Sequence, residues 1–167
     1  MRIVCAVVLL SSLALGDDFQ GKVIGVIDGD TVDVLVQRVP KRIRLYGIDA
    51  PEKGQAFGSR AREATGRRLA FGLMVKVVSH GTDRYGRILG DIFLPDGSMV
   101  NERLVEEGWA WHYTRYSNNP RLTDLEGAAR RARRGLWVDR QPIPPWEFRE
   151  ARRRSPAVGR QLCASSD

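Results

Sequence analysis

Cysteine and histidine are scarce in this chain. Among its 167 residues, the only ones of these two types are Cys5, Cys163, His80 and His112. Cys5 lies in an apolar leader and Cys163 close to the other end, so we expect no structural disulfide once the leader is removed. Zinc sites in proteins rely on cysteine and histidine ligands. The composition therefore argues against a zinc centre, and a catalytic metal should have oxygen ligands.

Lysine is also rare, although the chain is basic. It has 4 Lys beside 23 Arg, and its formal net charge is +7. The planar fork of arginine suits phosphate groups, so a polyanionic partner such as nucleic acid is one interpretation of this charge. A solvated basic surface or a coding bias explains the same excess equally well. Charge alone leaves this choice open.

No apolar run is long enough to span a membrane. At the N-terminus, Arg2 precedes the apolar run Ile3–Leu10, and small residues follow up to Gly16. This order is typical of a secretory signal peptide. We expect a signal over residues 1–16, cleavage before Asp17, and a secreted or periplasmic protein without stable membrane association. An uncleaved interfacial anchor is the alternative.

The rest of the sequence predicts one domain followed by a tail. Alternating or branched apolar residues predict five strands, at Gly21–Ile27, Thr31–Val36, Lys41–Ile48, Met74–Ser79 and Arg87–Leu94. Helical patterns predict three helices, at Ser59–Phe71, Ser98–Glu107 and Leu122–Arg134. Helices inserted after the third and fifth strands suit a small closed barrel of the OB type, an α+β fold. We expect this domain over residues 17–147 and a basic, disordered or loosely docked tail over 148–167.

Acidic residues stand at the ends of two predicted strands. Asp28 and Asp30 occur in the turn IDGDT, and Asp49 and Glu52 occur in the segment DAPE. Short carboxylates at strand ends can meet over a barrel mouth. With a nearby carbonyl and water they would form an oxygen site suited to Ca²⁺. IDGDT alone is also typical of an ordinary turn, and DAPE alone of the start of a loop. The prediction of a cation site therefore depends on the presence of both motifs.

Two arginines and one further carboxylate complete a set that could cleave a phosphodiester. Arg44 and Arg87 lie near the ends of predicted strands, where they could stabilise charge on a phosphoryl group. Glu52 lies beyond Pro51, so it is placed to take a proton from water rather than to share the ligand position. An outward-facing strand residue is the plainer interpretation of Arg44, and a residue leading a helix is that of Glu52.

Several motifs in order resemble the staphylococcal nuclease family. They are IDGDT, RLYGIDAPE, DRYGR, SMVNERLVEEGWA and GLW at Gly135–Trp137. Each motif is weak alone, but the ordered set is specific and covers roughly Gly21 to Trp146. The resemblance implies an OB-fold barrel and a calcium-dependent endonuclease that acts on DNA and RNA, leaves 3′-phosphate ends and works as a monomer.

The resemblance also implies a role for each matching residue. Ca²⁺ would be bound by Asp30, Asp49 and the main-chain carbonyl of Ala50. Glu52 would activate water, and Arg44 and Arg87 would bind and stabilise the scissile phosphate. Tyr85 and Tyr113 would lie near the nucleotide.

The chain departs from the best-known family member in two places. Ala50 replaces a threonine, which leaves the carbonyl ligand in place, and the loop after Glu52 is short and poor in lysine. The competing hypotheses are a catalytically inactive OB module that only binds nucleic acid and a basic protein that binds anionic surfaces. An inactive relative should have lost one of the charged site residues, and all are present here.

Overall fold

The structure, a computed structural model, describes residues 18–154. The predicted signal peptide and residues 155–167 of the predicted tail lie outside this range.

Five strands close into a barrel, as the sequence predicted. They are β1 (Phe19–Asp28), β2 (Thr31–Val36), β3 (Val39–Leu45), β5 (Met74–Thr82) and β6 (Ile88–Phe93). Their order around the barrel is β1-β2-β3-β6-β5, so the first three strands form an antiparallel meander. Strands β3 and β6 pair in parallel, β5 and β6 pair antiparallel, and the antiparallel pair β1 and β5 closes the barrel. The expected α+β fold with an OB-type barrel is confirmed.

Period-two alternation explains why these segments form a barrel. Val32 and Val34 of β2 and Ile43 and Leu45 of β3 are at most 1% exposed, whereas Arg42, directly before Ile43, is exposed. Alternate side chains of a strand point to opposite faces, so one face fills the barrel and the other meets solvent. The barrel interior is therefore a packed apolar core, and polar chemistry is confined to its ends and its outer face.

The third predicted strand is shorter than expected. β3 ends at Leu45, and β4 (Ile48–Asp49) pairs instead with β7 (Trp111–His112) in a separate two-stranded sheet. Gly47 between them has φ +74°, a conformation that favours glycine, and an added Cβ there would lie 3.1 Å from side-chain atoms of Leu122 and Ser117. The chain turns at Gly47, and this turn directs Asp49 out of the barrel sheet.

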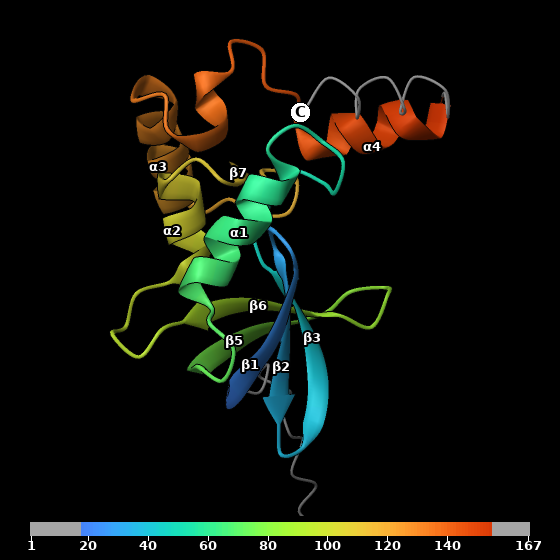
Figure 1. The fold of residues 1–167 in the computed structure, drawn as a ribbon, viewed down its shortest axis with the longest axis vertical. Helices are drawn as coiled ribbons and strands as arrows, with labels where there is room; N and C mark the ends of the chain where they lie inside the picture. Colours follow the sequence, from blue (N-terminus) through green and yellow to red (C-terminus); the bar gives the residue numbers. More distant parts are fainter. Residues whose placement is uncertain (1–17, 155–167) are drawn as a thin grey trace, which may run out of the picture.

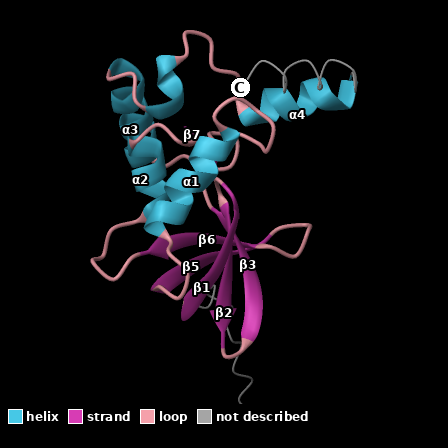
Figure 2. Cartoon of the chain, viewed as in Figure 1, coloured by secondary structure: helices cyan, strands magenta, loops and turns pink. Residues whose placement is uncertain are grey.

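The helices gather beyond one end of the barrel (Figure 2). They are α1 (Gly58–Arg68), α2 (Val100–Glu106), α3 (Pro120–Arg131), a 3₁₀ turn η1 (Gly135–Val138) and α4 (Pro145–Arg154). Ala61 and Ala64 of α1 are buried in the same apolar cluster as the barrel side chains. A second cluster contains Trp111, Ala129, Leu136 and Trp137. No helix within residues 18–154 combines the length and the apolarity needed to cross a bilayer.

Helix α4 is a difference from the sequence prediction, which began the loose tail at residue 148. Residues 148–154 instead complete α4, and Phe148 is 1% exposed. Pro145 at the helix start, Glu147 in the first turn and arginines in the last turn are all favourable helix-end residues. Figure 1 shows α4 beside the loop that leads into α1, so the C-terminal part of the described chain lies next to the segment that carries Glu52.

Candidate active site

Two buried aspartates meet where the β1–β2 turn approaches β4. Asp30 is 5% exposed and Asp49 is fully buried. The Asp30 carboxylate accepts a hydrogen bond from the backbone N–H of Ala50 at 2.7 Å, and the Asp30 N–H donates to Asp28 at 3.1 Å. The turn and the segment after β4 are thus tied together through Asp30. The two acidic motifs of the sequence form one cluster, as predicted.

Arg44 joins these carboxylates. Its Nη2 atom lies 3.0 Å from Oδ2 of Asp30 and 2.7 Å from Oδ1 of Asp49. Its Nη1 atom donates to the carbonyls of Leu45 and Ile48 at 2.9 and 2.8 Å. One guanidinium therefore fixes the turn between β3 and β4 and forms ion pairs with both aspartates. The Nε atom takes no part in these contacts.

Burial shapes the titration of Asp30. Loss of solvation raises the pKa of Asp30 to about 7, with the negative charges of Asp28 and Asp49 adding to the rise. The charge of Arg44 and the Ala50 N–H oppose this shift and only partly offset it. Burial and the neighbouring carboxylates thus disfavour the charged form of Asp30, a penalty that a bound cation would offset.

The donor set at this cluster fits a hard divalent cation. Asp30 and Asp49 both contact one nitrogen of Arg44, so the two carboxylates face the same point. Within residues 18–154, no three Asp, Glu, His or Cys side chains converge as metal ligands. The remaining ligands would have to be a carbonyl, such as that of Ala50, and water, which suits calcium.

Glu52 lies at the edge of the cluster, and a residue that sequence reasoning missed connects it. Arg149 of α4 places Nη1 2.5 Å from Oε1 of Glu52 and Nη2 2.7 Å from Oδ2 of Asp49. The sequence pattern assigned Arg149 to a loose tail. Pro144 and Pro145, followed by Trp146 and Phe148, could have indicated a helix start. Nothing in the sequence indicated that this helix packs beside Asp49.

Arg87 does not touch the carboxylate cluster. Its Nε atom donates to Oδ2 of Asp83 at 2.8 Å, and the side chain of Asp83 also accepts from the backbone N–H groups of Tyr85 and Arg87. The contact uses Nε, so the two terminal nitrogens take no part in it. Asp83 thereby shapes the loop between β5 and β6 and orients the Arg87 fork.

Tyr85 is 68% exposed, and the guanidiniums of Arg84 and Arg87 lie 4.8 and 5.5 Å from its ring centre. A hollow of about 410 Å³ brings Tyr85 and Arg87 together with Arg42 and Asp33 of the neighbouring strands. These groups form a basic and aromatic surface on the outer face of β2 and β3. The predicted role of Arg87 at a phosphate stays a prediction.

Tyr113 lies on the other side, next to α4. Its ring stacks on Trp146 with centroids 5.2 Å apart and planes 2° from parallel. The predicted role of Tyr113 near a nucleotide stays a prediction, because here this face of the ring packs against the helix.

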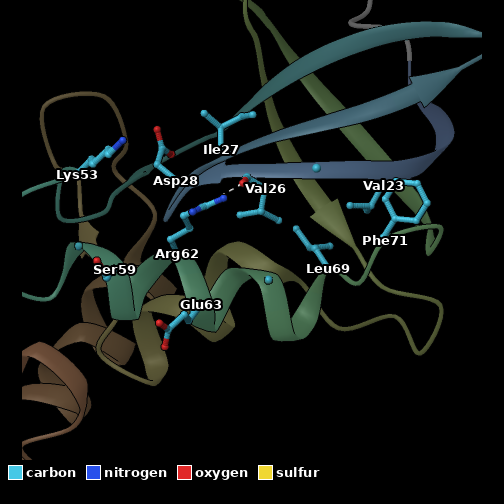
Figure 3. Close-up of a pocket in the computed structure, with 13 residues that line it drawn as sticks. Val23, Val26, Ile27, Asp28, Lys53, Ser59, Arg62, Glu63, Leu69 and Phe71 are labelled. Atoms are coloured by element: carbon cyan, nitrogen blue, oxygen red, sulfur yellow. Dashed lines mark hydrogen bonds between the residues drawn. The ribbon is translucent and has the colours of Figure 1, made fainter.

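A larger cavity of about 670 Å³ runs between β1 and α1 (Figure 3). Val26, Ile27, Leu69 and Phe71 give it apolar walls, and Asp28 and Lys53 lie at its end near the loop after β4. Asp30, Asp49 and Arg44 do not line it. The candidate site is therefore a largely buried cluster at the barrel end, with this cavity beside it.

Comparison with known proteins confirms the family that the sequence motifs predicted. A family model described as "Staphylococcal nuclease homologue" matches residues 42–139. The chain belongs to the staphylococcal nuclease family. An "Uncharacterized endonuclease" of Escherichia coli is 46% identical over 132 residues, which cover 79% of this chain and 86% of that protein.

Two further relatives extend the comparison. A "Micrococcal nuclease" of Shigella flexneri is 44% identical over 160 residues, covering 89% of this chain and 91% of that protein. A "Probable staphylococcal-like nuclease" of Oryza sativa subsp. japonica is 44% identical over 116 residues, covering 70% of this chain and 34% of that protein. The family match contains Arg44, Asp49, Glu52 and Arg87, whereas Asp30 precedes it and Arg149 follows it.

Proposed function

We propose that this protein is a calcium-dependent endonuclease that hydrolyses phosphodiester bonds of DNA and RNA and leaves 3′-phosphate ends. Membership of the nuclease family supports a hydrolase that acts on nucleic acids. The single observation that carries the finer proposal is the convergence of two buried aspartates and Arg44 at one point, with Glu52 beside them.

Each residue has a distinct part in the proposed reaction. Asp30, Asp49 and the Ala50 carbonyl hold Ca²⁺, which when bound would offset negative charge on the phosphodiester. Arg44 and Arg87 bind the phosphoryl oxygens and stabilise the charge that grows on them. Tyr85 and Tyr113 lie near the nucleotide.

Glu52 acts as the general base. Its carboxylate takes a proton from water as the water oxygen bonds to phosphorus. The bond from phosphorus to the 5′ oxygen breaks, and that oxygen leaves with a proton from solvent. The phosphate stays on the 3′ oxygen, which accounts for the expected product.

Plasmid digestion by the purified protein tests this proposal. We expect cleavage in calcium at neutral or alkaline pH and none with excess EDTA. The products should resist extension by a DNA polymerase until a 3′-phosphatase has treated them. Absence of cleavage in calcium would contradict the enzyme hypothesis, and binding without cleavage would favour the inactive OB module.

The cellular location and the assembly state are part of the same proposal. The apolar leader at residues 1–16 supports export to the periplasm or the medium, and the family resemblance supports a monomer. Fractionation of cells that express the full chain should place the activity outside the cytoplasm. Size-exclusion chromatography with light scattering should return the mass of one chain.

A further inference from the structure

Helix α4 is firmly packed against the body of the protein. Trp146 stacks on Tyr113 and meets Trp111 edge-on with ring centroids 5.7 Å apart. Phe148 on the same helix is 1% exposed. Aromatic pairs of this kind hold an element in one position. The side chains of α4 are thus presented to their neighbours from a fixed base.

The loop that carries Glu52 is tied to the segment before α4. Gln55 accepts the backbone N–H of Glu52 at 2.9 Å and donates from Nε2 to the carbonyl of Ile143 at 2.7 Å. Gln55 is 7% exposed, so these hydrogen bonds are shielded from water. The position of Glu52 therefore depends on the segment leading into α4 even before its own side chain is considered.

Arg149 then contacts both acidic groups directly. Its Nη1 atom lies 2.5 Å from Oε1 of Glu52 and 3.2 Å from Oδ1 of Asp49, and its Nη2 atom lies 2.7 Å from Oδ2 of Asp49. The side chain is 35% exposed, whereas that of Asp49 is 1% exposed. This is the planar two-point engagement of a carboxylate that arginine makes and lysine cannot.

The electrostatics of the cluster explain why arginine suits this position. Asp49 and Glu52 carry like charges and share the Nη1 atom of Arg149. Burial lowers the pKa of Arg149, but hydrogen bonds and charge from Asp49 and Glu52 outweigh it and raise the pKa overall. The guanidinium therefore stays charged wherever the protein is folded, and it can hold the two carboxylates side by side.

We infer that Arg149 is a further residue of the active site, which positions Glu52 and shares Asp49 with the divalent cation. This inference rests on the proposed function, because it assigns Arg149 to the same site. Both oxygens of Asp49 bind the Arg149 fork, so a cation that takes Asp49 as a ligand competes with the guanidinium for those oxygens. Arg149 should weaken calcium binding and at the same time support turnover.

The expected effects of removing Arg149 on calcium affinity and on turnover have opposite signs. A variant that merely unfolds would lose both. Removal of a purely structural arginine would weaken calcium binding and activity together. Removal of a competing and positioning arginine should tighten calcium binding while it slows the reaction. The variants R149K and R149Q test this, with R153Q as the control, because Arg153 carries the same charge on an exposed part of α4.

The readouts are calcium affinity by isothermal titration calorimetry without nucleic acid, and kcat and KM on DNA. We expect kcat to fall by about 10- to 100-fold in R149Q, as is typical when a partner of a metal ligand is lost, with a smaller change in KM. R149K should recover part of kcat, because lysine keeps the charge but not the fork. Calcium affinity should rise from wild type through R149K to R149Q, and R153Q should match wild type.

Several results would overturn the inference. Calcium affinity that is unchanged or weaker in folded R149Q would show that the guanidinium does not share Asp49. A wild-type kcat in R149Q would show that it does not position Glu52. If R149Q fails to fold, R149K provides the test. Wild-type calcium affinity and wild-type kcat in R149K would both contradict the inference. The calorimetry needs no substrate, so a protein that binds calcium without cleaving DNA would contradict the proposed function and still test the competition.

Discussion

Arg44 donates from Nη2 to Oδ1 of Asp49 at 2.7 Å, although the two residues lie in different sheets of the protein. The contact spans the turn at Gly47 that separates β3 from β4. Since the same nitrogen is also 3.0 Å from Asp30, a single side chain contacts both carboxylates that are predicted to bind calcium.

Replacement of Arg44 with glutamine should abolish most nuclease activity. The variant loses a phosphate-binding group and the shared counter-ion of Asp30 and Asp49. By analogy with arginines that stabilise phosphoryl transfer, we expect a loss of about 10³- to 10⁵-fold in kcat. Initial rates of plasmid cleavage provide the measurement. Arg103→Gln removes the same charge from α2, where Arg103 pairs with Glu106, and should cleave at the wild-type rate.

Calcium affinity should rise with pH and level off above about 7. Burial raises the pKa of Asp30 to about 7, with charges from Asp28 and Asp49 adding to the effect, so at lower pH a proton competes with the cation. Calcium titrations between pH 5.5 and 8.5, roughly one and a half units on either side of this value, provide the measurement. A pH-independent affinity would contradict this assignment of the titrating group.

The same shift predicts how stability depends on pH in the presence of a chelator. The pKa of Asp30 is higher in the folded protein than its ordinary value of 3.8, so protonation stabilises the fold. This contribution is complete below the ordinary value and is lost as pH rises through about 7. Melting curves in EDTA should show Tm falling across this window. Asp30→Asn removes the titrating group, so its Tm should fall less than that of wild type over the same range.

Glu52→Gln should cleave DNA slowly while still binding it. The amide keeps the shape of the side chain but cannot accept a proton, and loss of a general base typically costs about 10²- to 10⁴-fold in rate. Single-turnover cleavage and a gel-shift assay in calcium separate the two steps. Near wild-type cleavage would show that Glu52 is not the base. Glu106→Gln on α2 is the matched control, because it removes a carboxylate away from the site.

Asp83→Asn should impair the enzyme less than Arg87→Gln. Asp83 orients the Arg87 fork through Nε, and an asparagine retains part of this hydrogen bonding without the charge. If Arg87 binds the scissile phosphate, its removal should lower kcat/KM by about 10³-fold or more, and Asp83→Asn by about tenfold. Steady-state kinetics on one DNA duplex ranks the two variants. Equal losses of kcat/KM in the two variants would indicate that activity depends on the conformation of the loop rather than on the charge of Arg87.

Phe148→Ala should destabilise the protein by about 3–5 kcal/mol, the usual cost of truncating a buried phenylalanine. Because Phe148 helps to dock α4, the variant should also lose activity in the same direction as R149Q. Urea denaturation measures the stability change. Val138 is 58% exposed, and Val138→Ala should stay within about 0.5 kcal/mol of wild type.

Local patterns in the sequence predicted the barrel well. Val32, Val34, Ile43 and Leu45 alternate with polar residues, and such alternation depends only on neighbouring positions. It therefore predicted β2 and the part of β3 from Lys41 to Leu45, and the ordered motifs placed Asp30, Arg44, Asp49 and Glu52 in one site. The break after Leu45 was missed, because at Gly47 the chain leaves the barrel to meet distant segments, and the Gly47 carbonyl accepts from the N–H of Tyr113 at 2.8 Å.

By itself the sequence determined the barrel and the identity of the acidic and basic residues at its end, because periodicity and short motifs are local properties. Only the tertiary structure decided which charges meet. It separated Asp49 from the barrel sheet, paired Arg87 with Asp83, and returned Arg149 to Asp49 and Glu52. The contacts of Arg149 join residues up to 100 positions apart, and they depend on the packing of α4 through Trp146 and Phe148, which no local pattern encodes.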